Sequence, residues 1–191
     1  MLEKTPRPIG EALRGARAGM DKLVCRSDEF LDIPRSIALE SSAFGERDTI
    51  PARFTADGDG VSPPLSWSKV PADAVTLVLL VEDPDAPSLS PLVHALAWDL
   101  TAQDGGLPEG ALKGPAGEGE THDLGRNSFF KAEYLPPDPP TGHGPHHYVF
   151  QIYAVDRRLD LDGSPGRGKV VEAMTGHVLA IGELIGLYER L

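Results

Sequence analysis

Two short segments of the chain hold side chains that could bind a ligand together. Residues 83–87 form an acidic turn with the sequence Asp-Pro-Asp-Ala-Pro, and His94 follows shortly after it. Residues 142–148 read Gly-His-Gly-Pro-His-His-Tyr. Both segments lie at the ends of apolar runs, where proline- and glycine-rich turns can present polar groups rigidly to a ligand. We predict that the two segments line one small polar pocket.

The residue types in these segments suit an anion. His94, His146 and Tyr148 can each donate a hydrogen bond, and backbone N–H groups near the glycines can add more. A carboxylate such as Asp83 favours the charged form of a neighbouring imidazole and fixes its orientation. We therefore expect Asp83 to orient a histidine, and we expect the affinity for phosphate to fall as the pH rises through the histidine pKa.

Strand alternation selects among the histidines. Side chains two residues apart in a strand share a face, so His146 and Tyr148 lie together while His147 points away. His94 begins another apolar run and shares a face with Trp98. The alternation favours His146 and Tyr148 over His147 as pocket residues.

A metal-dependent enzyme is the main alternative. Two histidines and one carboxylate also form the iron site of many oxygenases, and the cluster of His143, His146 and His147 could bind zinc. The sequence lacks the HExxH zinc motif, and residues 57–61 depart from the calcium-loop pattern. It also lacks a GxSxG elbow, a phosphate-binding loop and a dinucleotide fingerprint. These absences disfavour a metal enzyme and nucleophilic catalysis, and we expect no cofactor.

The composition of the chain limits the classes of protein to which it can belong. The chain has 191 residues, of which 40% are hydrophobic and 25% are charged, and this is typical of a globular protein. Its net charge of −11 argues against a general nucleic-acid binder. The single Cys25 cannot form an internal disulfide. No apolar stretch is long enough for a membrane helix and no secretory signal is evident, so we expect a cytoplasmic protein without an integral membrane segment.

Residues 1–36 differ from the rest of the chain, and we divide the protein into this arm and a domain of residues 37–191. Apolar residues in the arm recur at helical spacing, namely Ile9, Leu13, Ala16, Met20 and Leu23. This stripe predicts an amphipathic helix that Pro8 could begin. Its apolar face must be covered by the body or by a second subunit, which gives a reason to expect a homodimer. Such a helix can also be a targeting or membrane-surface element.

The body is predicted to be mainly β. Strands are expected at residues 52–55, 75–82, 94–100 and 148–155, because these short runs are rich in apolar and β-branched residues and are bounded by turn-forming clusters. The second and fourth of these runs are the most apolar and should be central. Residues 104–126 suggest a long surface loop that borders the site. Residues 169–176 indicate a short helix, and residues 180–188 a final strand or an irregular helix.

An ordered set of motifs resembles the phosphatidylethanolamine-binding protein family, in its bacterial and archaeal, Raf-kinase-inhibitor-like branch. The resemblance runs from about residue 50 to residue 190 and rests on residues 50–55, 57–67, 83–87, His94 with Trp98, 125–129, 142–154 and 174–180. It implies a β-sandwich with a small anion pocket at the ends of central strands. Residues 1–36 lie outside the resemblance, so the expected fold is this mainly β sandwich together with the short C-terminal helix and the N-terminal helical arm indicated by apolar spacing.

The resemblance also implies the site and its ligand. The pocket would be lined by Asp83, Pro87, His94, Gly144, His146 and Tyr148, with Asp85 as a secondary candidate. In this family the pocket holds a phosphate-like or carboxylate group, either on a small molecule or on a phosphorylated partner. The resemblance therefore implies a binding protein that is not an enzyme, and the family names suggest modulation of a kinase or protease. This chain departs from the pattern at His147, where many relatives carry arginine. We expect His143, between the two glycines, to lie near the rim.

Overall fold

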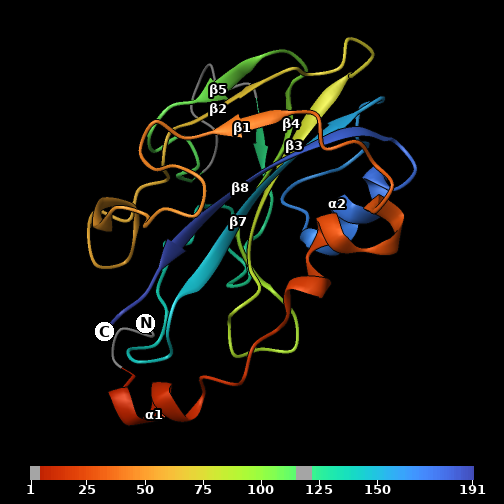
Figure 1. Cartoon of the computed structure of the whole chain (residues 1–191). Coiled ribbons are helices and arrows are strands. Elements are labelled where there is room, and N and C mark those ends of the chain that lie inside the picture. Colours follow the sequence, from red (N-terminus) through yellow and green to blue (C-terminus); the bar gives the residue numbers. More distant parts are fainter. Residues whose placement is uncertain (1–4, 115–121) are drawn as a thin grey trace.

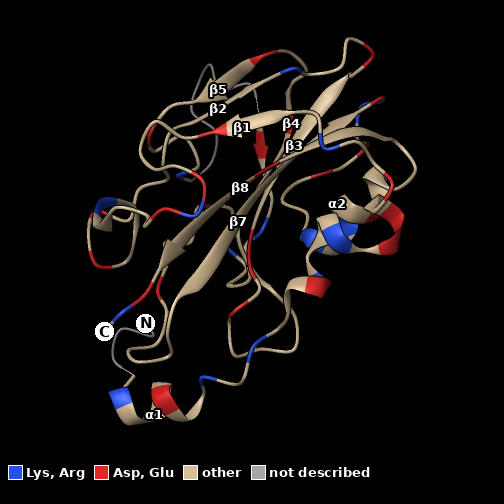
Figure 2. Cartoon of the chain, viewed as in Figure 1, with Lys and Arg blue, Asp and Glu red and all other residues tan. Residues whose placement is uncertain are grey.

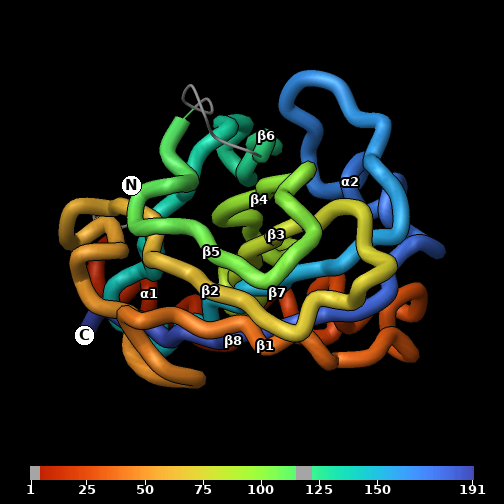
Figure 3. The backbone as a smooth tube through the Cα atoms, turned by 90° about the horizontal axis from the view of Figure 1, so that it is seen from above, coloured from red at the N-terminus to blue at the C-terminus, as the bar shows by residue number. Residues whose placement is uncertain are grey.

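The computed structural model describes residues 5–114 and 122–191 and contains two antiparallel sheets. The larger sheet has the strand order β6 (Asp123–Leu124), β4 (Leu92–Thr101), β3 (Thr76–Asp83), β7 (His146–Val155) and β8 (Val178–Tyr188). The smaller sheet has the order β1 (Ala38–Glu40), β2 (Leu65–Ser68) and β5 (Gly105–Leu107). Figure 3 shows the strand order of the larger sheet from β6 to β8. The predicted mainly β fold is confirmed.

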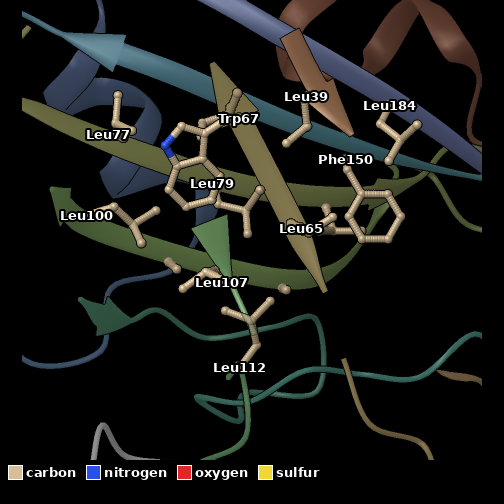
Figure 4. Close-up of a cluster of buried hydrophobic side chains, with 14 of the residues drawn as sticks. Leu39, Leu65, Trp67, Leu77, Leu79, Leu100, Leu107, Leu112, Phe150 and Leu184 are labelled. Carbon is tan, nitrogen blue, oxygen red and sulfur yellow. The ribbon is translucent and has the colours of Figure 1, made fainter. Parts of the chain in front are cut away.

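One hydrophobic core lies between the two sheets. Trp67 of β2 packs with Leu79 of β3 and Phe150 of β7 in a single buried cluster (Figure 4). Alternate side chains of the central strands point into this cluster because side chains in a strand alternate between the two faces of the sheet.

A second core covers the opposite face of the larger sheet. There, Val78 and Tyr153 pack in one cluster with Met174 of α2 (Arg167–Met174) and with Leu23 and Phe30 of the arm. Figure 1 shows the arm and α2 on the same side of this sheet. Strands β3 and β7 are therefore buried on both faces, as their continuous apolar runs predicted.

The arm follows a different path from the predicted helix. The helix α1 (Arg7–Ala12) is followed by three single 3₁₀ turns, η2 (Met20–Lys22), η3 (Val24–Arg26) and η4 (Asp28–Phe30). The prediction of one amphipathic helix from Ile9 to Leu23 is wrong. The backbone N–H groups of Ala18 and Gly19 donate to carbonyls of the 83–87 turn, not to a preceding helical turn, and Gly19 has a positive φ of 112°.

The apolar stripe of the arm is thus divided. Leu23 is fully buried against the larger sheet, so the expectation that the arm docks on the body is confirmed for this residue. Ile9 is half exposed. Because the arm packs on its own body, an uncovered stripe no longer gives a reason for a homodimer, and the dimer stays a prediction.

Other elements also bear on the predictions. Residues 52–55 form no strand, because Ala52–Phe54 is a 3₁₀ turn closed by hydrogen bonds to the Ala52 carbonyl. The predicted C-terminal helix corresponds to α2, and the last segment is the strand β8. The predicted loop at residues 104–126 includes β5 and β6, and its residues 115–121 lie outside the described residues.

The two α-helices among the described residues are short. They have six and eight residues and carry charges of both signs (Figure 2). In the described part of the chain, no helix has the length and apolar character needed to cross a membrane.

Candidate functional site

One edge of the larger sheet gathers the predicted site residues. Strand β3 ends at Asp83, which pairs with the beginning of β4, and the preceding residue pairs with Val149 near the beginning of β7. Because both neighbours run antiparallel to β3, the starts of β4 and β7 lie beside its end. This register brings together Asp83, His94, His146 and Tyr148 from three strands.

These side chains line a cavity of about 460 Å³. Its wall contains five of the predicted residues, namely Asp83, Pro87, His94, His146 and Tyr148. It also contains residues that were not predicted as site residues, among them Asn127, Phe129, Lys131, Glu133, Tyr134 and Asp138. All six come from the irregular segment between β6 and β7, where no periodic pattern indicates which side chains point inward. Gly144 and Asp85 lie outside this wall.

A chain of hydrogen bonds runs from the cavity wall into the arm. Nδ1 of His146 lies 2.7 Å from Oδ2 of Asp83, and its Nε2 lies 2.7 Å from Nδ1 of His143. Nε2 of His143 in turn donates to the carbonyl of Leu13, at 2.8 Å. His143 is fully buried, so the expectation that it lies near the rim is wrong. Its imidazole is the link between the pocket and the arm.

The number of hydrogens needed for these three hydrogen bonds determines the net charge of the group formed by Asp83, His146 and His143. Each of the three hydrogen bonds requires one hydrogen, but two neutral imidazoles supply only two. The third belongs to an imidazolium or to a protonated carboxyl, and the group is electrically neutral in either case. Burial, and then the charge of His146, lower the pKa of His143, which disfavours a charged imidazolium at His143. His146 therefore keeps neither ring nitrogen free for a ligand.

Two other groups in the wall lack partners. Nδ1 of His94 lies 2.7 Å from the Leu135 carbonyl, but its Nε2 is buried without a hydrogen-bond partner. The Tyr148 hydroxyl is likewise buried and unsatisfied. The two rings meet edge-on, with centroids 5.0 Å apart. Because buried polar atoms are nearly always hydrogen-bonded, this pair indicates where a ligand would complete the site.

The pKa values of these two side chains keep both groups neutral at neutral pH. Burial lowers the pKa of His94, although the nearby charge of Asp83 acts in the opposite direction. Burial and then Asp83 raise the pKa of Tyr148 well above its usual value.

Asp85 and Gly144 do not line the cavity and lie next to Arg17 of the arm. Oδ2 of Asp85 accepts hydrogen bonds of 2.7 Å from both the backbone N–H and Nδ1 of His147, and its Oδ1 pairs with Arg17. Burial acts to raise the pKa of Asp85, but these hydrogen bonds prevail and lower it. Gly144 has a φ of 97° and lies beside the Arg17 guanidinium. His147 thus points away from the cavity, as strand alternation predicted.

The cavity wall is rich in acceptors. It holds three carboxylates, those of Asp83, Glu133 and Asp138, and Lys131 is the only lysine or arginine among the described residues that line it. The Lys131 ammonium lies 3.2 Å from Glu133. Asp138 is paired with Arg190.

Metal binding finds no support in this geometry. Among residues 5–114 and 122–191, no group of three histidine, cysteine or acidic side chains is arranged to hold a metal ion. His94 offers one free nitrogen, but both nitrogens of His146 are engaged.

A two-sheet β fold with a ligand-sized cavity at the ends of its central strands defines a β-sandwich of the ligand-binding type. The model of the family described as phosphatidylethanolamine-binding protein matches residues 40–189, and the chain belongs to this family. The resemblance predicted from the ordered motifs is confirmed. The arm, residues 1–36, lies outside the match.

Relatives occur in archaea and bacteria. A UPF0098 protein of Pyrococcus abyssi is 42% identical over 151 residues, covering 78% of this chain and 84% of its own length. A UPF0098 protein of Methanothermobacter thermautotrophicus is 41% identical over 153 residues, covering 80% and 98%. Among solved structures, a phosphatidylethanolamine-binding protein homologue from Chlamydia trachomatis is similar with a TM-score of 0.74 and 35% identity, covering 82% of this chain and 99% of that one. YbcL of E. coli, described as a member of the mammalian family, gives a TM-score of 0.73 at 26% identity, covering 80% and 98%.

Proposed function

We propose that this chain is a non-enzymatic binding protein whose cavity holds a small anionic group, such as phosphate or a phosphorylated head group. The observation that carries the proposal is the pair of buried, unpartnered groups in one cavity wall, Nε2 of His94 and the hydroxyl of Tyr148. A cavity of about 460 Å³ has room for a phosphate with a short organic substituent. Asp83 then acts as an orienting partner of His146 and not as a ligand.

Binding is favoured over catalysis by the chemistry of the wall. Among the described residues that line the cavity there is no serine, threonine or cysteine to act as a nucleophile. In the hydrogen-bonded pair of His146 and Asp83, the second ring nitrogen of His146 is engaged by His143. The metal site of two histidines and one carboxylate considered from the sequence would need a second free imidazole beside His94.

A protein that carries the anion is a further candidate ligand. Phe129 lines the cavity and is 43% exposed, and the adjacent Phe130 is 81% exposed, so apolar contacts are available at the cavity and next to it. We propose that a kinase or protease partner would present a phosphorylated or carboxylate group to the same pocket. Capture of such a partner by the immobilised chain, with and without competing phosphate, tests this proposal: capture that phosphate leaves unchanged contradicts it.

Calorimetric titration of phosphoethanolamine tests the anion site. Tyr148→Phe removes one hydroxyl and keeps the ring in the core, so we expect a loss of affinity of about tenfold, as for one hydrogen bond. Tyr153→Phe is the matched control, because Tyr153 is a buried tyrosine of the same strand whose hydroxyl donates to Gln151 in the second core. Binding that is equal in wild type and Tyr148→Phe, or absent in both, contradicts the proposal.

A further inference from the structure

The hydrogen bond to Leu135 fixes which nitrogen of His94 carries the hydrogen. A carbonyl can only accept, so the hydrogen of a neutral ring lies on Nδ1, 2.7 Å from the Leu135 oxygen. The other nitrogen, Nε2, then carries the free lone pair of a residue that lines the cavity. This atom is buried and has no partner among the described residues.

The surroundings of His94 keep its ring neutral. Asp83 from β3 and Asp138 from the segment before β7 favour protonation, as does the Leu135 carbonyl. His146 of β7 opposes protonation, and the edge-on ring of Tyr148 adds no charge. Burial has the largest effect, and the net result is a lowered pKa. A ligand therefore meets an acceptor at Nε2, and not a donor.

The charged groups in the rest of the cavity wall also disfavour a fully ionised anion. Three carboxylates line the cavity, and the ammonium of Lys131 is already close to Glu133. A lone pair of a fully ionised oxyanion that faces Nε2 would be repelled. An acidic oxygen that still carries its hydrogen would instead donate to Nε2, while the Tyr148 hydroxyl donates to another oxygen of the ligand.

We infer that the pocket selects oxyanions that carry a proton of their own, an inference that rests on the proposed function. Phosphate monoesters then bind as monoanions, and sulfate esters are rejected. A site built to bond a particular hydrogen discriminates strongly against an analogue that lacks it, because its buried polar atom is then left unpaired. Phosphate monoesters retain a second proton with a pKa of about 6, whereas sulfate esters have none to offer at this pH.

Methyl phosphate and methyl sulfate are a matched pair for the test, since at pH 6 the binding form of one and the only form of the other have the same charge and shape. We expect the full-length protein to bind methyl phosphate at least tenfold more tightly than methyl sulfate in calorimetric titrations at pH 6. Equal affinities overturn the inference and leave the anion-binding proposal intact. If neither compound binds, and phosphoethanolamine also fails to bind, both proposals fall.

Proton uptake gives a second readout that needs no variant. At pH 8 methyl phosphate is almost entirely a dianion, so its binding should take up close to one proton, measured as a dependence of the apparent binding enthalpy on the ionisation enthalpy of the buffer. Affinity for total methyl phosphate should fall about fiftyfold from pH 6 to pH 8, as the monoanion is depleted. Binding at pH 8 without proton uptake overturns the inference.

A variant assigns the effect to His94. The side-chain amide of His94→Gln can donate as well as accept, so we expect the preference for methyl phosphate over methyl sulfate to shrink severalfold in this variant. An unchanged preference in a folded His94→Gln protein contradicts the role given to Nε2.

Discussion

Arg17 of the arm forms an ion pair with Asp85, 68 positions away in the sequence. The same guanidinium donates to the carbonyl of Pro145, at 3.0 Å. One side chain therefore connects the turn that follows Asp83 at the end of β3 with the segment that precedes His146 at the start of β7. The arm is packed against both segments that form the pocket.

Loss of this connection should weaken both stability and binding. Arg17→Ala leaves a largely buried Asp85 with His147 alone, and we expect the free energy of unfolding to fall by about 1–2 kcal/mol, since the arginine itself is partly exposed. Affinity for methyl phosphate should fall severalfold. Urea denaturation and calorimetry measure the two effects. The control is Arg7→Ala, whose solvent-exposed pair with Glu11 should contribute little to stability. Equal effects of the two substitutions would refute the positioning role of Arg17.

Gly10 should tolerate no side chain. A Cβ at this position would lie 2.0 Å from the carbonyl oxygen of Thr141, so α1 would have to move away from the segment before β7. We expect Gly10→Ala to destabilise the protein by about 1–3 kcal/mol, as other overpacking substitutions do. Gly15→Ala is the control, because its Cβ would meet nothing within 4 Å. Limited proteolysis should cut the arm sooner in Gly10→Ala only, and equal cleavage of the two variants would show that the close approach is unimportant.

The buried, neutral His94 should make stability depend on pH. Because its pKa is lower in the folded protein, the unfolded chain binds more protons, and stability is lost as the pH falls below the unfolded pKa of about 6.5. His143 acts in the same direction. We expect the urea midpoint to decrease from pH 7.5 to pH 5, and to decrease less in His94→Gln. Identical pH dependence in the variant and the wild type would contradict the neutral state of His94.

Cys25 should be unreactive in the native protein. Burial, and then the charge of Glu183, raise the pKa of its thiol to about 12, so little thiolate exists at neutral pH. Modification by a thiol reagent such as 5,5′-dithiobis(2-nitrobenzoate) should be slow in buffer and fast in concentrated urea. Rapid labelling of the native protein would show that the arm opens readily around this residue.

Much of the site was predictable from local pattern. The alternation of a strand placed His146 and Tyr148 on one face and His147 on the other, and the structure confirms this division. The apolar runs at residues 75–82 and 148–155 identified the two central strands. The first feature follows from the two-residue period of an extended chain, and the second from the continuous apolar sequence of a strand that is buried on both faces.

The path of the arm was not predictable in the same way. Apolar spacing from Ile9 to Leu23 is compatible with a helix, but the backbone of Ala18 and Gly19 bonds to the 83–87 turn, far away in the sequence. Tertiary contacts of this kind override a weak local preference that three glycines already reduce.

By itself, the sequence determined the family, the β architecture and the side chains that meet at one sheet edge. The reason is that strand period and the order of the motifs can be read from the sequence without knowing any tertiary contact. Only the tertiary structure decided how those side chains are protonated and bonded. The Leu135 carbonyl makes Nε2 of His94 an acceptor, and His143 occupies the free nitrogen of His146. The hydrogen-bonding role of a side chain depends on the partner that tertiary packing brings within 3 Å. For both histidines this partner lies outside the strands, so strand alternation could not predict it.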